Sequence, residues 1–175
     1  SHVSVNYRDA TRQGVSYLAR MGHKRIAMIT ASKKSYSILQ KEAGYKQALE
    51  DNHILFDPEL MVNGSFHYES GYEKGLLLMQ MDNPPTAIIA ISDTTAAGCL
   101  CAVYESGKHC PDDVAILGFD NMILSRMLYP PLTTVAIRKK LMGSTAVKML
   151  LDRIAGDETR RELLLPHEIV VRQSV

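Results

Sequence analysis

One stretch constrains the fold more than any other part of the chain: residues 84–98, which read PPTAIIAISDTTAAG. Two prolines precede the unbroken apolar run 87–91, and the chain then passes through Ser92 and Asp93 into a segment of small residues. A continuous apolar run bounded by turn signals is typical of a strand buried on both faces, and serine or aspartate favours the start of a helix. Because open parallel sheets bind ligands at the carboxyl ends of their strands, Ser92 and Asp93 are the first candidate site residues.

The same alternation of buried strands and helices extends over the rest of the chain. Predicted strands are residues 3–5, 26–30, 60–62, 86–91, 114–118 and 162–171, and predicted helices run from 9 or 11 to 21, 37–51, 68–81, 93–105 and 138–155. Strands and helices in this order form right-handed parallel units, so we predict an α/β fold with a Rossmann-like parallel sheet flanked by helices. Gly71 and Gly75 lie four residues apart on one helix, which favours close packing against a neighbour.

Composition narrows the classes of function. The chain has 20 lysines and arginines against 19 acidic residues, with no basic block, so we expect this part of the protein not to bind DNA directly. Cys99, Cys101 and Cys110 lack the spacing of metal ligands, which favours reduced thiols in the cytoplasm. No apolar segment is long enough to cross a bilayer, and we expect no membrane association.

Two aspartates are the candidates for chemistry. Asp93 and Asp120 both follow predicted strand ends, so they would face one crevice of a parallel sheet. Paired carboxylates can serve as general acid and base, or they can accept hydrogen bonds from the hydroxyls of a polyol. The alternative is structural: Asp93 would cap its helix and Asp120 would hold a turn.

Motifs of catalysis and cofactor binding are missing from the sequence. Ser92, Ser125 and the cysteines have no histidine at a recognisable spacing, and no nucleophile elbow or dinucleotide fingerprint is present. The six histidines form no metal-binding pattern. We therefore predict no catalytic residue, no cofactor and no metal. The loop 32–35, SKKS, is either a phosphate-binding loop or a solvated basic loop.

Several motifs occur in the order typical of one protein family. They are Gly22–Ala27 (GHKRIA), Ala43–Tyr45 (AGY), Pro85–Gly98, Pro111–Asn121 (PDDVAILGFDN), Pro131–Val135 (PLTTV) and Val170–Ser174 (VVRQS). Together they resemble the lactose/galactose repressor family of bacterial transcription regulators, and the resemblance covers essentially the whole chain.

The resemblance implies a periplasmic-binding-protein-like (type I) effector domain of two lobes. Residues 1–22 would end the N-terminal lobe and residues 23–134 would form the C-terminal lobe. Residues 135–157 would supply a return helix of the N-terminal lobe, and residues 158–175 the final strand of the C-terminal lobe. The DNA-binding headpiece is not among these segments.

The family pattern also implies which residues touch a small-molecule effector. Carried over position by position, they are Asp9, Lys41, Ser92, Asp93, Asp120 and Ile137. Family members usually have arginine in place of Lys41, and lysine lacks that bidentate geometry. Ser92 replaces a frequent asparagine, which implies a different ligand. The expected effector is a sugar, a sugar phosphate or a nucleoside.

The implied function is the ligand-binding and dimerisation part of a cytoplasmic transcriptional repressor. It would form a homodimer, in part through the helix at 68–81, and would reach operator DNA only through the headpiece. Helices 9–21 and 138–155 are expected to leave apolar faces open for another copy. Two alternatives remain: a periplasmic sugar-binding protein of an uptake transporter, and an enzyme that uses Asp93 and Asp120.

Overall fold

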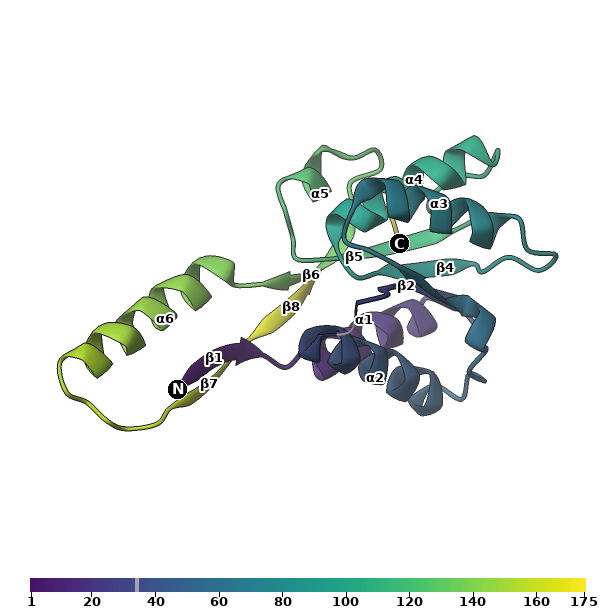
Figure 1. Cartoon of the computed structure of the whole chain (residues 1–175). Helices are drawn as coiled ribbons and strands as arrows, with labels where there is room; N and C mark the ends of the chain where they lie inside the picture. Colours follow the sequence, from purple (N-terminus) through teal and green to yellow (C-terminus); the bar gives the residue numbers. More distant parts are fainter. Residues whose placement is uncertain (34) are drawn as a thin grey trace.

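The computed structural model describes residues 1–33 and 35–175. The elements are β1 (His2–Val5), α1 (Tyr7–Arg20), β2 (Ile26–Ala31), α2 (Tyr36–Asp51), the 3-10 helix η1 (Pro58–Leu60), β3 (Met61–Gly64), α3 (Tyr68–Met79), β4 (Ala87–Ala90), α4 (Asp93–Glu105), β5 (Ala115–Phe119), α5 (Leu124–Met127), β6 (Thr133–Ile137), α6 (Lys139–Ile154), β7 (Glu162–Leu165) and β8 (His167–Val170). Figure 1 shows a body built around the larger sheet and an arm made of α6, β1 and β7.

The body is organised around a six-stranded sheet with the order β3-β2-β4-β5-β6-β8. Neighbouring strands run parallel except β8, which pairs antiparallel with β6. Every residue of β2, β4 and β5 is buried, because helices cover both faces of the sheet. The predicted α/β fold with a parallel sheet is confirmed.

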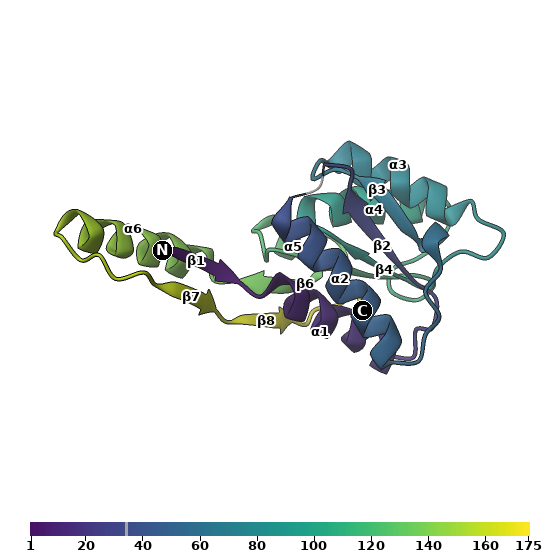
Figure 2. The same cartoon turned by 60° about the horizontal axis from the view of Figure 1, so that its bottom comes forward.

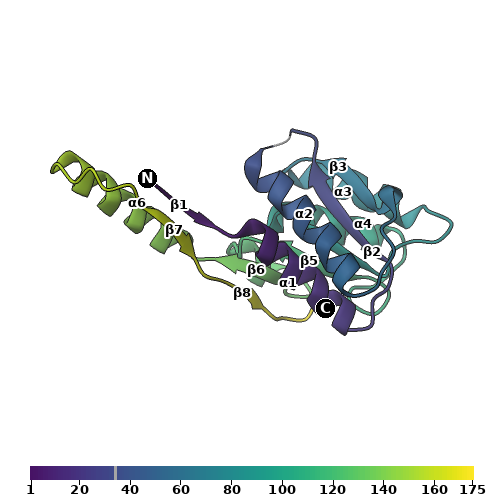
Figure 3. The same ribbon diagram turned by 90° about the horizontal axis from the view of Figure 1, so that it is seen from below.

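Two helical layers enclose the sheet. Helices α1 and α2 cover one face, and α3 and α4 cover the other, as Figures 1 and 3 show from two directions. On the first face Val15, Leu18 and Tyr45 pack against the sheet, and on the second Leu78 and Val103 do so. The apolar face of α1 is therefore covered by its own chain rather than left open, contrary to the expectation for helix 9–21.

Glycines set the distance between α3 and α4. A Cβ atom at Gly71 would lie 2.0 Å from the carbonyl oxygen of Thr95, and one at Gly98 would lie 2.0 Å from that of Tyr68. Only glycine permits two helix backbones to approach this closely. The close packing predicted from the spacing of Gly71 and Gly75 is confirmed.

The arm extends away from the body. Strands β1 and β7 form a separate two-stranded parallel sheet, and α6 lies beside them (Figure 2). Every residue of α6, all of which the structure describes, is at least partly exposed, including Leu150 and Ile154. The predicted open apolar face of this helix is confirmed.

One predicted strand differs from the structure. The strand predicted at 162–171 is two strands in different sheets, because Pro166 lacks a backbone N–H and the chain changes sheet there. Around the division expected after Gly22, β1 pairs with β7 in the arm, whereas α1 packs in the core of the body. The periodicity located α1 correctly but carried no information about which sheet it covers.

Among the described residues, no helix combines the length and the apolar character needed to cross a membrane.

Candidate functional site

The carboxyl ends of β4 and β5 place three predicted site residues at one edge of the sheet. Because β4 and β5 are parallel neighbours, Ser92 and Asp93 after β4 lie beside Asp120 after β5. The two carboxyl groups are close enough that the charge of Asp120 contributes to raising the pKa of Asp93. The expectation that they share one edge is confirmed.

Ser92, rather than Asp93, caps helix α4. Its side-chain oxygen accepts from the backbone N–H of Thr95 at 3.2 Å and lies 2.9 Å from the Thr95 hydroxyl. Ser92 is almost fully buried, so its hydroxyl is committed to the start of the helix. Of the two cap residues left open by the sequence, the first is the one used.

Asp93 is buried and holds other parts of the chain together. Its carboxylate accepts from the Thr134 hydroxyl and from the backbone N–H of Met122, each at 2.6 Å. Burial raises the pKa of Asp93 to about 6, although both hydrogen bonds act in the opposite direction. Asp93 has no exposed surface in this conformation and therefore connects α4, β6 and the loop after β5.

Asp120 is the aspartate that remains open to a ligand. It is partly exposed, and its backbone has a φ angle of 102°, which lies in the left-handed region. None of the described residues donates a hydrogen bond to its carboxylate. The arrangement presents an acceptor with free hydrogen-bonding capacity at the edge of the sheet.

Lys41 is directed into the protein. Its ammonium donates to the carbonyl oxygen of Ile91 at 2.8 Å and lies 3.5 Å from the centre of the Phe119 ring. Burial lowers the pKa of Lys41 to about 8, against the opposing effect of Asp120 and Asp93. Lys41 thus lies beneath the edge that carries Asp120, where it contributes positive charge next to the two carboxylates.

Asp9 and Ile137 lie apart from the buried cluster of Ser92, Asp93 and Lys41. Asp9 lines a surface groove of about 310 Å³ between α1 and α2, accepts from Gln13 at 2.8 Å and lies 3.5 Å from Nε2 of His167. Ile137 ends β6, half-buried against the body, and its backbone pairs with His167. Both residues therefore lie where the chain passes between body and arm.

Two aromatic residues at the same edge were not predicted from the sequence. Tyr7, in the first turn of α1, lies 6.3 Å from the Phe119 ring, and burial together with Asp120 raises its pKa. Phe66 follows the carboxyl end of β3 and is 46% exposed. An aromatic residue shortly after a predicted strand was the available sequence signal for Phe66, whereas Tyr7 is brought there by the path of α1.

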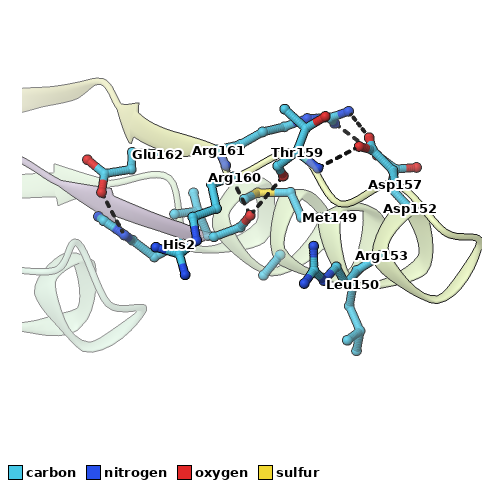
Figure 4. A pocket seen from close by; sticks show the side chains of 13 residues that line it. His2, Met149, Leu150, Asp152, Arg153, Asp157, Thr159, Arg160, Arg161 and Glu162 are labelled. Atoms are coloured by element: carbon cyan, nitrogen blue, oxygen red, sulfur yellow. Dashed lines mark hydrogen bonds and ion pairs between the residues drawn. The ribbon is translucent and has the colours of Figure 1, made fainter.

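A separate cavity belongs to the arm. It has a volume of about 500 Å³ and lies between α6 and the β1–β7 pair. Figure 4 shows its lining, in which Arg161 bonds to Asp152 at 3.0 Å and also pairs with Asp157. The cavity contains none of the predicted site residues, and three of its charged lining residues, Asp152, Asp157 and Arg161, pair with one another.

The loop 32–35, metal binding and the aspartate pair are the other features considered from the sequence. In the loop 32–35, Lys34 lies outside the described residues, and the Ser32 backbone N–H donates to the Gly64 carbonyl oxygen at 3.0 Å. Within the described part of the chain, no group of three or more histidine, cysteine or acidic side chains could hold a metal ion. A catalytic pair formed by Asp93 and Asp120 is disfavoured, because Asp93 is enclosed by protein.

Comparison with known proteins adds independent evidence. Residues 15–175 match the family described as periplasmic binding protein-like domain. The chain is 35% identical over 160 residues to the transcriptional repressor PurR of Mannheimia succiniciproducens, covering 91% of this chain and 48% of that protein. It is 34% identical over 173 residues to the repressor CytR of Escherichia coli, covering 98% and 51%. It thus spans about half the length of the curated relatives it matches.

Solved structures of transcriptional regulators are also similar to this chain. A putative transcriptional regulator LacI from Bacillus cereus subsp. cytotoxis superimposes with a TM-score of 0.96 at 32% identity, covering all of this chain and 62% of that one. The complex of the transcriptional regulator CelR with cellobiose gives a TM-score of 0.95 at 31% identity, covering 100% and 54%.

Proposed function

We propose that this chain, which belongs to the periplasmic-binding-protein-like family in the branch of the lactose/galactose repressor regulators, is the effector-binding part of a transcriptional repressor. The observation that carries the proposal is the Asp120 carboxylate, which stands unpartnered among the described residues at the carboxyl edge of the sheet. Ligands of open parallel sheets bind at this edge. That the relatives are repressors favours a regulator over the periplasmic sugar-binding protein of a transporter.

The proposed ligand is a sugar or a sugar derivative such as a nucleoside. Hydroxyl groups would donate to Asp120, and the exposed ring of Phe66 would pack against an apolar face of the ligand. The similarity to CelR, whose structure is a complex with cellobiose, supports a sugar. In this proposal Asp120 contacts the ligand, whereas Ser92, Asp93 and Lys41 support the site from beneath.

The two-lobe arrangement is part of the proposal. The six-stranded body would be the C-terminal lobe, and β1, β7 and α6 would belong to the N-terminal lobe. The chain passes between them near Asn6, Arg138 and Pro166, and these crossings would form the hinge. Asp9 and Ile137 would then act at the hinge rather than on the ligand. An effector that binds one lobe arrangement more tightly shifts their equilibrium and thereby alters DNA binding.

Self-association is proposed to use the outer face of α3 and α4. Tyr68 and Leu77 on α3 and Tyr104 on α4 are exposed apolar side chains of these two helices, and Tyr129 lies close to Tyr104. The hydroxyl of Tyr104 donates to the carbonyl oxygen of Tyr129 at 3.4 Å. We infer a homodimer that binds operator DNA through a DNA-binding headpiece and acts in the cytoplasm without catalysing a reaction.

A thermal-shift screen of the full-length protein tests the proposed site. The compounds are cellobiose, glucose 6-phosphate and cytidine, one for each ligand class. One compound is expected to raise the Tm of the wild type, because binding to the native state stabilises it. Asp120→Asn is expected to reduce that increase, since an amide is a weaker acceptor than a carboxylate.

The control is Asp112→Asn, an exposed aspartate in the turn that precedes the opposite end of β5. It is expected to keep the full Tm increase. An equal increase in the wild type and in Asp120→Asn would contradict the assignment of Asp120.

A further inference from the structure

The segment 172–174 near the end of the chain contacts the loop that carries Asp120. Arg172 follows β8, and its guanidinium donates to the Asn121 side-chain oxygen at 2.7 Å, to the Ser125 hydroxyl at 3.0 Å and to the Leu132 carbonyl oxygen. Its own backbone N–H donates to the Thr133 hydroxyl at 2.9 Å. A single side chain from the far end of the sequence thus joins both ends of the β5–β6 connection.

The loop has a backbone that needs support. Asp120 and Asn121 have φ angles of 102° and 47°, and neither is glycine. Consecutive left-handed residues persist only where their surroundings fix them. Such positions concentrate at binding sites, where they present a side chain in a direction that an ordinary turn does not allow.

Three successive backbone N–H groups in this turn each have an acceptor. That of Asp120 donates to the Val135 carbonyl oxygen at 2.8 Å, and that of Asn121 donates to the Thr134 hydroxyl at 3.3 Å. The third, on Met122, donates to Asp93 at 2.6 Å. These contacts fix one side of the turn. The Asn121 side chain provides a further attachment, because its oxygen accepts from Arg172 at 2.7 Å.

We propose that Arg172 is a positioning residue, which holds the Asp120–Met122 turn in the conformation that presents the Asp120 carboxylate to the ligand. The inference rests on the proposed function for the role of Asp120 in binding. The fork geometry is essential to it, because the guanidinium bonds Asn121, Ser125 and Leu132 at once. A lysine at this position would keep the charge but could not make the same set of bonds.

The first test needs no ligand. Hydrogen exchange is measured in the full-length protein on peptides that cover residues 119–128, for the wild type, Arg172→Gln and Arg172→Lys. Both variants are expected to exchange roughly tenfold faster at residues 120–122, with unchanged exchange in β2. Unchanged exchange at 120–122 would overturn the proposal, and so would an equal increase throughout the body, which indicates only lost stability.

The second test measures affinity for cellobiose, glucose 6-phosphate and cytidine. Arg172→Gln is expected to weaken binding of the responding probe about tenfold. The matched control is Arg25→Gln, because Arg25 is also half-buried and donates to a backbone carbonyl, that of Asn83, at 2.7 Å. It is expected to lower the Tm and to leave affinity within about twofold.

The outcomes separate the two claims. Equal affinities of Arg172→Gln and Arg25→Gln would overturn the positioning role in binding. A wild type that binds none of the three probes would contradict the proposed ligand classes. In that case the exchange measurement still decides whether Arg172 holds the turn.

Discussion

Replacing Asp93 by asparagine is expected to change how the stability of the protein depends on pH. The carboxyl group is buried, and its pKa is raised from 3.8 to about 6, mainly by burial. Below pH 3.8 it is protonated in both the folded and the unfolded state. Between pH 3.8 and about 6 it ionises in the unfolded chain first, so a rising pH progressively disfavours the folded state. Above about pH 6 the carboxyl group is ionised in both states, and the free energy of unfolding no longer falls because of Asp93.

The size of the effect follows from the two pKa values. A difference of about 2 pKa units corresponds to about 3 kcal/mol in the free energy of unfolding. Asparagine does not titrate, and the carboxylates elsewhere in the chain are common to both proteins. The free energy of unfolding of the wild type, relative to Asp93→Asn, is therefore expected to fall by about 3 kcal/mol as the pH rises across this interval.

Urea denaturation of both proteins at pH 3.5, 4.5, 5.5 and 7 measures this difference. The Asp93→Asn variant keeps only one of the two side-chain oxygens that accept from the Met122 N–H and the Thr134 hydroxyl, which lowers its stability at every pH. The pKa shift of Asp93 determines only how the difference in free energy of unfolding between the two proteins changes with pH. Parallel profiles would refute it, because they would mean that Asp93 titrates alike in the folded and unfolded states.

Two further substitutions test the packing and the proposed self-association. Gly71→Ala places a Cβ atom 2.0 Å from the Thr95 carbonyl oxygen and is expected to cost roughly 1–3 kcal/mol in urea denaturation, whereas Gly143→Ala, with open space around it, is expected to be neutral or stabilising. Equal effects of the two would contradict the close approach of α3 and α4. Leu77→Lys is expected to weaken dimerisation of the full-length protein at least tenfold in sedimentation, while Leu55→Lys, at an exposed loop leucine, leaves it unchanged. Dimerisation that is unaffected by Leu77→Lys would exclude this face.

The sequence predicts the body of the fold well because the buried strands are unambiguous. The apolar runs before Ser92 and Asp120 identify β4 and β5, and parallel pairing of neighbours then brings those residues to one edge. The sequence pattern does not show the break at Pro166, because the apolar residues on both sides of it together resemble one strand. The sheet to which each half belongs depends on long-range pairing, which local patterns do not contain.

The roles of individual side chains were less predictable. Ser92 and Asp93 are adjacent in the sequence, and either could have capped α4. Asp93 instead accepts hydrogen bonds from Thr134 and Met122, which come from distant parts of the chain, and Ser92 is the residue that caps α4. The direction of Lys41 likewise depends on the Ile91 carbonyl oxygen and the Phe119 ring. Motif spacing identifies such positions but not whether they face a ligand or the core.

The location of bound ligand tests the central claim most directly. Hydrogen exchange of the full-length protein is compared with and without the compound that raises the Tm most in the thermal-shift screen. We expect protection at residues 65–67, 91–94 and 119–123, the loops at the carboxyl edge of the sheet. Protection confined to the cavity between α6 and the β1–β7 pair, or to the turn at 111–113, would contradict a ligand site at Asp120.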